Sequence, residues 1–293
     1  METVLPNGMW FDLDDPESPE LDDLAKRFGL HELQVEDCRH RPQRCKAEDH
    51  EHYKLAILKQ VRHGSGEELI FDDVDLFLGP DFLISVRQGE PALFDRVRAR
   101  AAEEQVKRLD WVFYMIADEI VDGYQPVLDW FAEEIDAVED VVLEQPTPET
   151  LARIFALRRS LIDFRRAATG VREVINSLTR REKGLLGEDL GVYLRDVYDH
   201  TIRTVDIIET FQDLLAGTLD IYMSAVANRT NEVMKVLTIW GTVALPLLII
   251  TGFFGMNLGL PWMHQAHGVV YAVGLMGASS VVILAYFKWK RWY

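Results

Sequence analysis

Two long apolar runs lie near the C-terminus of this 293-residue chain. The first, at 236–254, has 19 residues and the second, at 268–287, has 20; between 236 and 287 there is no Asp, Glu, Lys or Arg. At about 1.5 Å per helical residue, each run is long enough to cross a hydrocarbon core of about 30 Å. A pair of buried core helices is the alternative, but the loop between the runs also lacks charge. The pattern therefore predicts two membrane spans.

The N-terminal ninety residues alternate short apolar stretches with turn residues, as strands and hairpins do. The turn sequences "GSG" and "GPD" are typical of hairpin connections. A helix is expected in "SPELDDLAKRFGL", with Ser18 as N-cap, Pro19 at the first position and Gly29 near the end. The expected strands lie at 8–13, 53–61, 68–79 and 81–88.

From Pro91 onward the apolar positions follow a helical period. One helix ends before "PTPE", and Pro148 opens the next. We therefore expect an α+β domain, in which a mixed sheet has flanking helices and a helical hairpin.

A single helix is predicted over residues 190–254, because Pro246 is the one strong breaker in this range and neighbouring membrane helices can accommodate it. Its 65 residues would extend for roughly 100 Å. Such a helix needs partners to bury its apolar positions, which favours oligomerisation.

One stripe of this helix has an unusual composition. Positions that are alternately four and three residues apart lie on one side of the helix, because this pattern repeats every seven residues. We call this side of the helix the seam. The first half of the seam is polar or small and the second half is small or aliphatic. A water-filled pore with a hydrophobic constriction has this pattern. For the part from Asp220 to Asn231, a helix with its polar side in solvent explains the pattern equally well. The seam comprises Asp220, Ser224, Ala227, Asn231, Met234, Thr238, Gly241, Leu245, Leu248 and Gly252.

Charge is distributed unevenly between the two parts of the chain. Residues 1–228 carry a formal charge of −21 and residues 229–293 carry +4. Basic residues flank both spans on one side, which the positive-inside rule places in the cytoplasm. The strong acidity argues against a nucleic-acid partner, and two cysteines suit a reducing compartment. We see no cleavable signal peptide, and we expect an inner (plasma) membrane protein with two spans and both termini in the cytoplasm.

The last hundred residues resemble the CorA family of magnesium transporters. The resemblance rests on "YLRDVYDHTIRTVDIIETFQDLLAGTLDIYMSAVANRTNEVMKVLTI", the proline-bearing first span, "FGMN" after that span, and the ending "KWKRWY". It implies a homopentameric funnel with a cytoplasmic domain (1–187), a stalk helix that continues into a pore-lining span (188–254), an outer loop (255–267), a second span (268–287) and a basic tail (288–293).

The resemblance also implies roles for single residues. Five copies of Asn257, after Gly255 and Met256, would form a ring that holds a hydrated Mg²⁺ through its waters, since magnesium sheds water reluctantly. Asp220 and Asn231 would form inner rings, with Ser224, Gly241, Leu245 and Leu248 along the pore and with Met234 and Leu237 as the gate. Asp196 would belong to a regulatory Mg²⁺ site between protomers, with Glu90 or Asp95 as its partner.

Two features depart from the family pattern. The loop "LGLPWMHQAH" lacks the carboxylate common after the Asn, and Leu248 replaces a hydroxyl side chain found in some members. His264 and His267 in this loop could attract Zn²⁺, as in a related zinc-transporting branch, but solvent-facing histidines are the preferred interpretation because Asn257 and Met256 fit the magnesium pattern. A transporter of Zn²⁺, Co²⁺ or Ni²⁺ with the same architecture is the second hypothesis. A membrane-anchored metal sensor without a pore is the third hypothesis.

A group of potential zinc ligands lies at 38–52, but its spacing matches no tight finger pattern. A structural role for this segment is the preferred interpretation. The chain has no nucleophile elbow, phosphate loop or His-Glu-x-x-His motif, so we do not expect an enzyme. The group comprises Cys38, His40, Cys45, His50 and His52.

Overall fold

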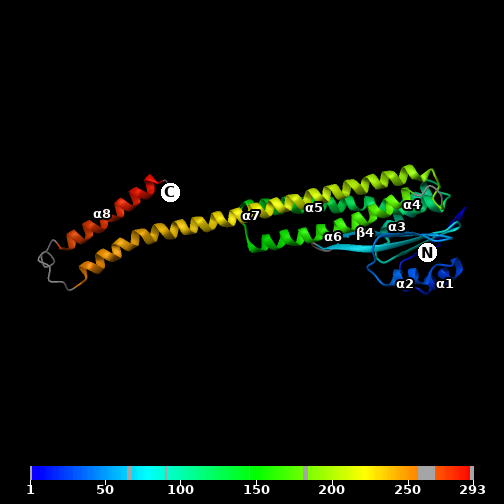
Figure 1. The fold of residues 1–293 in the computed structure, drawn as a ribbon, viewed down its shortest axis with the longest axis horizontal. Coiled ribbons are helices and arrows are strands. Elements are labelled where there is room, and N and C mark those ends of the chain that lie inside the picture. The colour runs from blue at the N-terminus through cyan, green and yellow to red at the C-terminus, as the bar shows by residue number, and fades with distance from the viewer. Residues whose placement is uncertain are drawn as a thin grey trace. The chain divides into compact units, whose positions relative to one another are not determined.

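The structure is a computed structural model that describes residues 2–64, 68–89, 91–144, 146–180, 184–256 and 268–290. The chain forms two compact units, Met1–Asp220 and Ile221–Tyr293. The first contains a sheet with helices on both faces, and the second contains the apolar end of a long helix and a further apolar helix (Figure 1).

The first unit is built on one six-stranded sheet with the order β1-β2-β6-β5-β4-β3. Strands β2 and β6 pair in parallel, and every other neighbouring pair is antiparallel. The mixed sheet that the sequence predicts is therefore confirmed. The strands are β1 (Glu2–Leu5), β2 (Gly8–Leu13), β3 (Lys46–Asp49), β4 (Lys54–His63), β5 (Leu69–Leu78) and β6 (Phe82–Arg87).

Two short helices, α1 (Pro19–Phe28) and α2 (Glu32–Arg39), cover one face of the sheet (Figure 1). Ser18 caps α1 by accepting a hydrogen bond from the Glu20 N–H, and Gly29 ends it in the left-handed region at φ 68°. The expected signals for this helix are thus confirmed. Helix α2 and the edge strands β1 and β3 were not expected, because the N-cap of α2 is His31, an unusual capping residue, and the edge strands are short.

The other face of the sheet packs against the helical part of the unit. Helix α6 contacts β3 and β4, while α4 contacts β4 and β5. Pro148 opens α6 as expected, with Thr147 as its N-cap. The four helices are α3 (Ala92–Glu103), α4 (Leu109–Asp122), α5 (Tyr124–Glu144) and α6 (Pro148–Thr179).

A cluster of charged residues fixes the start of the long helix α7 (Leu190–Phe254). Arg108 Nη1 lies 2.7 Å from Asp189 Oδ2, and the Gly187 N–H donates to Asp110 Oδ2 over 3.0 Å. Arg108 also pairs with Asp110. The hydrogen bond from Arg108 lowers the pKa of Asp189, so the carboxylate before α7 stays ionised.

Helix α7 has the 65 residues that the sequence predicts. Its first part packs into unit 1, and Thr218 Oγ1 donates to Glu139 Oε1 of α5 over 3.0 Å. The helix α8 (Gly268–Trp289) follows. Both α7 and α8 are long and apolar enough to cross a membrane. The buried apolar side chains of α7 in unit 1 are Leu190, Leu194, Val197, Val205, Ile208 and Leu215.

Candidate ion pathway and regulatory residues

The seam of α7 is exposed along its full length. All ten of its positions, from Asp220 to Gly252, are classed as exposed in the single chain. Met234 is 54% exposed and Leu248 is 69% exposed. A Cβ added at Gly241 or Gly252 would meet no atom within 4 Å in the part of the chain that the structure describes.

The opposite side of α7 is partly covered. At 100° per residue, the partly buried positions in the apolar half of α7 form a stripe about half a turn from the seam. Helix α8 in the same unit has a matching stripe at Ala272, Met276, Ser279, Ile283 and Phe287. Both helices thus have a partly buried stripe among residues 221–256 and 268–290, whereas every seam position is exposed. The α7 stripe comprises Ile239, Val243, Pro246, Leu247, Ile250 and Phe254.

Hydroxyl groups in this half of α7 bond within the helix. Thr238 Oγ1 donates to the Met234 carbonyl over 2.7 Å, and Thr251 Oγ1 donates to the Leu247 carbonyl over 2.9 Å. The hydroxyl of Thr238 therefore has its hydrogen-bond partner within the helix, and the methyl group of Thr238 is left to contribute to the surface of the seam. The surface next to Met234 is therefore more apolar than the sequence alone suggests.

Two residues of the predicted "GMN" motif, Gly255 and Met256, lie among the described residues. The Gly255 N–H donates to the Thr251 carbonyl over 2.9 Å, and the Met256 N–H donates to the Phe253 carbonyl over 3.2 Å. These bonds extend the helical hydrogen-bond pattern two residues beyond the end of α7. Asn257, together with His264 and His267, lies outside the described residues.

Asp196, the first predicted regulatory residue, lies on α7 beside α4. Its Oδ2 is 3.9 Å from Nε2 of His200, and Nδ1 of the same ring is 3.8 Å from Oδ1 of Asp122. Burial and the charge of Asp118 raise the pKa of Asp122. His200 thus stands between carboxylates from two helices. Sequence reasoning missed Asp122 and His200, because Asp122 is 74 positions from Asp196 and no motif connects them.

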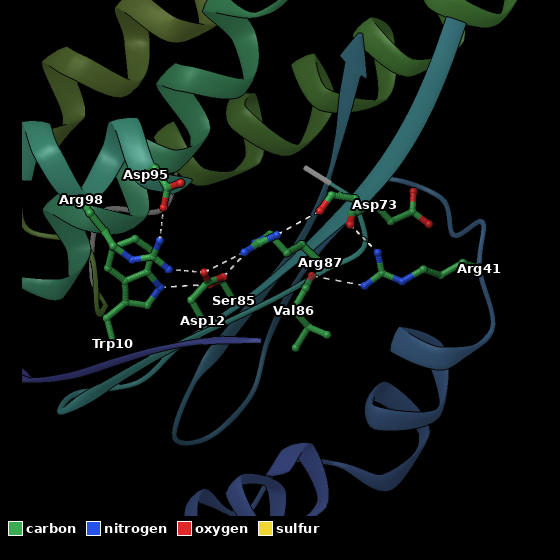
Figure 2. A network of polar contacts seen from close by, with 10 residues as sticks. Trp10, Asp12, Arg41, Asp73, Ser85, Val86, Arg87, Asp95 and Arg98 are labelled. Atoms are coloured by element: carbon green, nitrogen blue, oxygen red, sulfur yellow. Dashed lines mark hydrogen bonds and ion pairs between the residues drawn. The ribbon is translucent and has the colours of Figure 1, made fainter. Parts of the chain in front are cut away.

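Asp95, the second predicted regulatory residue, lies in the first turn of α3 and is 63% exposed at its side chain. Arg98 Nη1 donates to its Oδ1 over 2.8 Å, as Figure 2 shows. The same guanidinium donates to the buried carboxylate of Asp12. Glu90, which the sequence analysis places first as the partner of Asp196, lies outside the described residues.

Asp12 is the centre of the network in Figure 2. It accepts a hydrogen bond from Ser85 Oγ over 2.9 Å and from Arg87 Nε over 3.2 Å, besides the bond from Arg98. The Trp10 indole N–H in turn donates to Ser85 Oγ over 3.0 Å. Two guanidinium groups and several hydrogen bonds thus compensate one buried carboxylate, which is the condition for burying charge without a large penalty.

Asp196 and Asp95 do not meet in a metal site within one chain. In the described ranges, no group of three or more His, Cys, Asp or Glu side chains is arranged to hold a metal ion. Asp196 contacts α4 through His200, whereas Asp95 contacts β2 through Arg98.

The Cys/His segment at 38–52 runs from α2, which contains Cys38, through β3 to the connection before β4. Burial raises the pKa of the Cys38 thiol and raises that of Cys45 to about 11. His40 faces Glu36 in solvent, while the His50 ring stacks on Tyr53 with centroids 4.8 Å apart.

Arg41 gives this segment a structural role. Its guanidinium donates to Asp75 Oδ2 over 2.6 Å. Figure 2 shows its further bonds to the carbonyls of Asp73 and Val86. Arg41 therefore anchors the connection before β3 to the sheet, in agreement with the interpretation preferred from the sequence.

The fold and the two apolar helices define the class of this protein. It is an integral membrane protein with an α+β domain and a long helix that continues into the membrane segment. The model of the family described as "CorA-like Mg2+ transporter protein" matches residues 7–291. The chain belongs to this family of transporters.

Three known proteins illustrate the similarity. The cobalt/magnesium transport protein CorA of Thermotoga maritima is 38% identical over 275 residues, which cover 92% of this chain and 78% of that protein. The complete CorA structure from Methanocaldococcus jannaschii has a TM-score of 0.85 at 22% identity, covering 96% of this chain and 90% of the other. The full-length CmaX structure has a TM-score of 0.79 at 22% identity, covering 99% and 90%.

Proposed function

We propose that this protein is a homopentameric channel for divalent cations, Mg²⁺ first, in the inner (plasma) membrane. Residues 1–187 form the cytoplasmic domain, 188–254 the stalk and pore-lining span, 255–267 the outer loop, 268–287 the second span and 288–293 a basic tail. Both termini lie in the cytoplasm, because the basic residues that flank the two spans lie on one side.

The observation that carries this proposal is the exposed seam of α7, which lies opposite a partly buried stripe of the same helix. Cyclic symmetry places copies of one face around a common axis. Each seam residue then becomes a ring. Asp220, Ser224 and Asn231 form the polar inner part of the pathway.

The apolar half of the seam supplies the gate. Met234 and Leu237 are 54% and 64% exposed in the single chain, and five copies of each form a constriction that closes by dewetting. Gly241 provides space beyond them, and Leu245 and Leu248 continue the apolar lining.

Selectivity at the outer mouth is assigned to Asn257, with Gly255 and Met256 positioning it. Amide oxygens accept hydrogen bonds from the waters around Mg²⁺ without holding the ion as tightly as carboxylates do. The membrane potential then drives the ion inward, with about 4.6 kcal/mol per 100 mV for two charges.

Closure is assigned to a Mg²⁺ site between protomers. Asp196 of one protomer and Asp95 or Glu90 of its neighbour hold the ion when cytosolic Mg²⁺ is high. Support comes from the exposure of Asp196 and Asp95 and from their separate surroundings within one chain. When the ion leaves, like charges face each other and the ring loosens.

Co²⁺ is a second candidate substrate, because a relative 38% identical to this chain is named a cobalt/magnesium transport protein. Zn²⁺ and Ni²⁺ remain alternatives through His264 and His267 of the loop. A membrane-anchored metal sensor without a pore is disfavoured, because a helix that only anchors a protein does not require an exposed seam of small and polar residues.

The proposal is tested by ion uptake into liposomes that contain the full chain. We expect saturable Mg²⁺ uptake, and loss of most of it in Asn257→Ala. A substitution in the same loop, Gln265→Ala, serves as the control. Equal flux in wild type and Asn257→Ala would show that the Asn257 ring has no part in transport. Absence of uptake of Mg²⁺, Co²⁺ and Zn²⁺ alike would favour the hypothesis of a metal sensor without a pore.

A further inference from the structure

One guanidinium lies between an exposed carboxylate and a buried one. Arg98 Nη1 donates to Asp95 Oδ1 over 2.8 Å, and Arg98 Nη2 donates to Asp12 Oδ2, as Figure 2 shows. The side chain of Asp95 is 63% exposed, whereas that of Asp12 is 2% exposed. Arg98 therefore connects a carboxylate that dissolved cations can reach with one that they cannot reach.

Contacts with the sheet hold Arg98 in this position. Its Cζ lies 5.1 Å from the centroid of the Trp10 ring, and the face of an aromatic ring attracts a guanidinium. The Trp10 indole N–H donates to Ser85 Oγ, and this hydroxyl donates to Asp12 over 2.9 Å, so the ring and the buried carboxylate hold each other in place. Charge-assisted bonds to a buried carboxylate are strong. Arg98 is therefore fixed independently of its bond to Asp95.

Asp95 is held less firmly than Arg98. Among the described residues, its carboxylate forms no ion pair other than the one with Arg98. Exposed ion pairs are weak, because water competes for both partners. Asp95 can therefore exchange the guanidinium for another cation, while Arg98 stays with Asp12 and Trp10.

The charges of this network cancel each other. Arg87 and Arg98 supply two positive charges, and Asp12 and Asp95 supply two negative charges. A divalent cation that approaches Asp95 meets its carboxylate together with a fixed positive charge beside it. Because like charges repel, Arg98 lowers the affinity of Asp95 for such a cation.

The Asp95 carboxylate fits Mg²⁺ as a ligand. Magnesium prefers oxygen ligands, keeps several of its waters and is commonly held through one or two carboxylates. An exposed carboxylate leaves room for these waters, and Arg98 bonds to only one of its two oxygens. The ion and the guanidinium thus have overlapping claims on the same group.

We propose that Arg98 is an internal competitor of the regulatory cation at Asp95. When cytosolic Mg²⁺ is low, the guanidinium pairs with Asp95. When Mg²⁺ is high, the ion replaces the guanidinium at Asp95, and Arg98 keeps its contacts with Asp12 and Trp10. This competition rests on the proposed regulatory role of Asp95, and it raises the Mg²⁺ concentration at which the channel closes.

Arg98→Gln tests the competition in liposomes preloaded with graded Mg²⁺. The substitution removes the positive charge and keeps an amide that can donate to Asp12. The internal Mg²⁺ concentration for half-inhibition of uptake should fall by about threefold to tenfold. Arg98→Lys keeps a positive charge near Asp95 and should shift it less. A merely structural role of Arg98 gives the opposite sign, because a loosened unit needs more Mg²⁺ to close.

A second measurement does not depend on transport. A ligand that binds the folded state raises the unfolding temperature according to its affinity. For the full chain in lipid nanodiscs, Mg²⁺ below saturation should raise the unfolding temperature more in Arg98→Gln than in wild type, each measured against the same protein without Mg²⁺. In the Asp95→Asn background, Arg98→Gln should change neither the unfolding shift nor the half-inhibition.

Arg96→Gln is the matched control, because Arg96 lies on the same helix and pairs with Glu119 instead. It should leave half-inhibition close to wild type, and an equal shift in Arg96→Gln and Arg98→Gln would overturn the proposal. If Asp95→Asn weakens closure but Arg98→Gln does not tighten it, the competition fails while the regulatory site stands. If Asp95→Asn leaves closure unchanged, the regulatory role of Asp95 fails and the competition fails with it.

Discussion

His200 on α7 lies 3.8 Å from Asp122 on α4, measured from Nδ1 to Oδ1. The other ring nitrogen is 3.9 Å from Asp196, one turn earlier on α7. The proposed regulatory carboxylate therefore stands beside a contact between the long helix and the sheet-bearing unit. A cation that binds Asp196 acts at the place where α7 is held to α4.

Asp196→Lys should weaken closure by internal Mg²⁺. A lysine at this position repels the cation and cannot ligate it, so the internal Mg²⁺ concentration for half-inhibition of uptake should rise by at least about tenfold. The measurement is uptake into liposomes preloaded with graded Mg²⁺. Asp213→Lys, an exposed carboxylate on the same helix, is the control. Unchanged inhibition in Asp196→Lys would count against this site.

The hydrophobic gate predicts a leak when it is made polar. Met234→Asn wets the constriction, so flux at saturating internal Mg²⁺ should rise severalfold over wild type. Val236→Asn is the matched control, since Val236 is 55% exposed but lies off the seam. A leak of equal size in both variants would show that the seam does not define the gate.

Glycine at 241 should matter for flux and not for folding. Ala is favoured over Gly in a helix by about 1 kcal/mol, and among the described residues no atom outside the adjacent helix backbone lies within 4 Å of the added methyl group. Gly241→Ala should therefore fold normally and carry less Mg²⁺, because five methyl groups narrow the pathway. Gly274→Ala on α8 also has free space in the chain but should keep wild-type flux. Equal flux in the two variants contradicts the assignment of Gly241 to the pore.

The buried Asp75 predicts a pH-dependent stability. Burial raises its pKa from 3.8 to about 6, so the folded state holds this proton more tightly than the unfolded state. The contribution of Asp75 to stability is then largest below pH 4 and falls as pH rises to 6, by about 3 kcal/mol.

Asp75→Asn removes this titration. The difference in unfolding free energy between wild type and Asp75→Asn should therefore shift against wild type between pH 4 and pH 6. Thermal unfolding of both proteins across this range measures the shift. Parallel pH profiles would mean that Arg41, 2.6 Å away, offsets the burial completely.

The elements that could be predicted from the sequence carry strong local signals. Ser18, Pro19 and Gly29 define α1 by capping and backbone geometry, and the lack of a strong breaker other than Pro246 indicates α7. Helix α2 escaped prediction because His31 caps it through Nδ1, a rare arrangement. The edge strands β1 and β3 have four residues each, too few for a clear alternation.

The surroundings of the candidate residues could not be predicted in the same way. The seam of α7 follows from a seven-residue repeat, but the partly buried stripe on the opposite side is seen only in the folded chain. The ion pair of Asp95 with Arg98 is local, whereas the bond from Arg98 to Asp12 joins residues 86 positions apart. Such contacts depend on how the strands and helices meet in space, which no local pattern specifies.

The central claim is that the exposed seam of α7 lines the ion pathway. It is tested by blocking Mg²⁺ uptake with a membrane-impermeant cationic thiol reagent in Leu248→Cys, with Ile250→Cys on the covered stripe as the control. The wild-type protein measures the background reaction of the reagent with Cys38 and Cys45, both of which have raised thiol pKa values. The account predicts loss of most of the flux in Leu248→Cys and little change in Ile250→Cys; block of Ile250→Cys alone, or equal block of both, would contradict it.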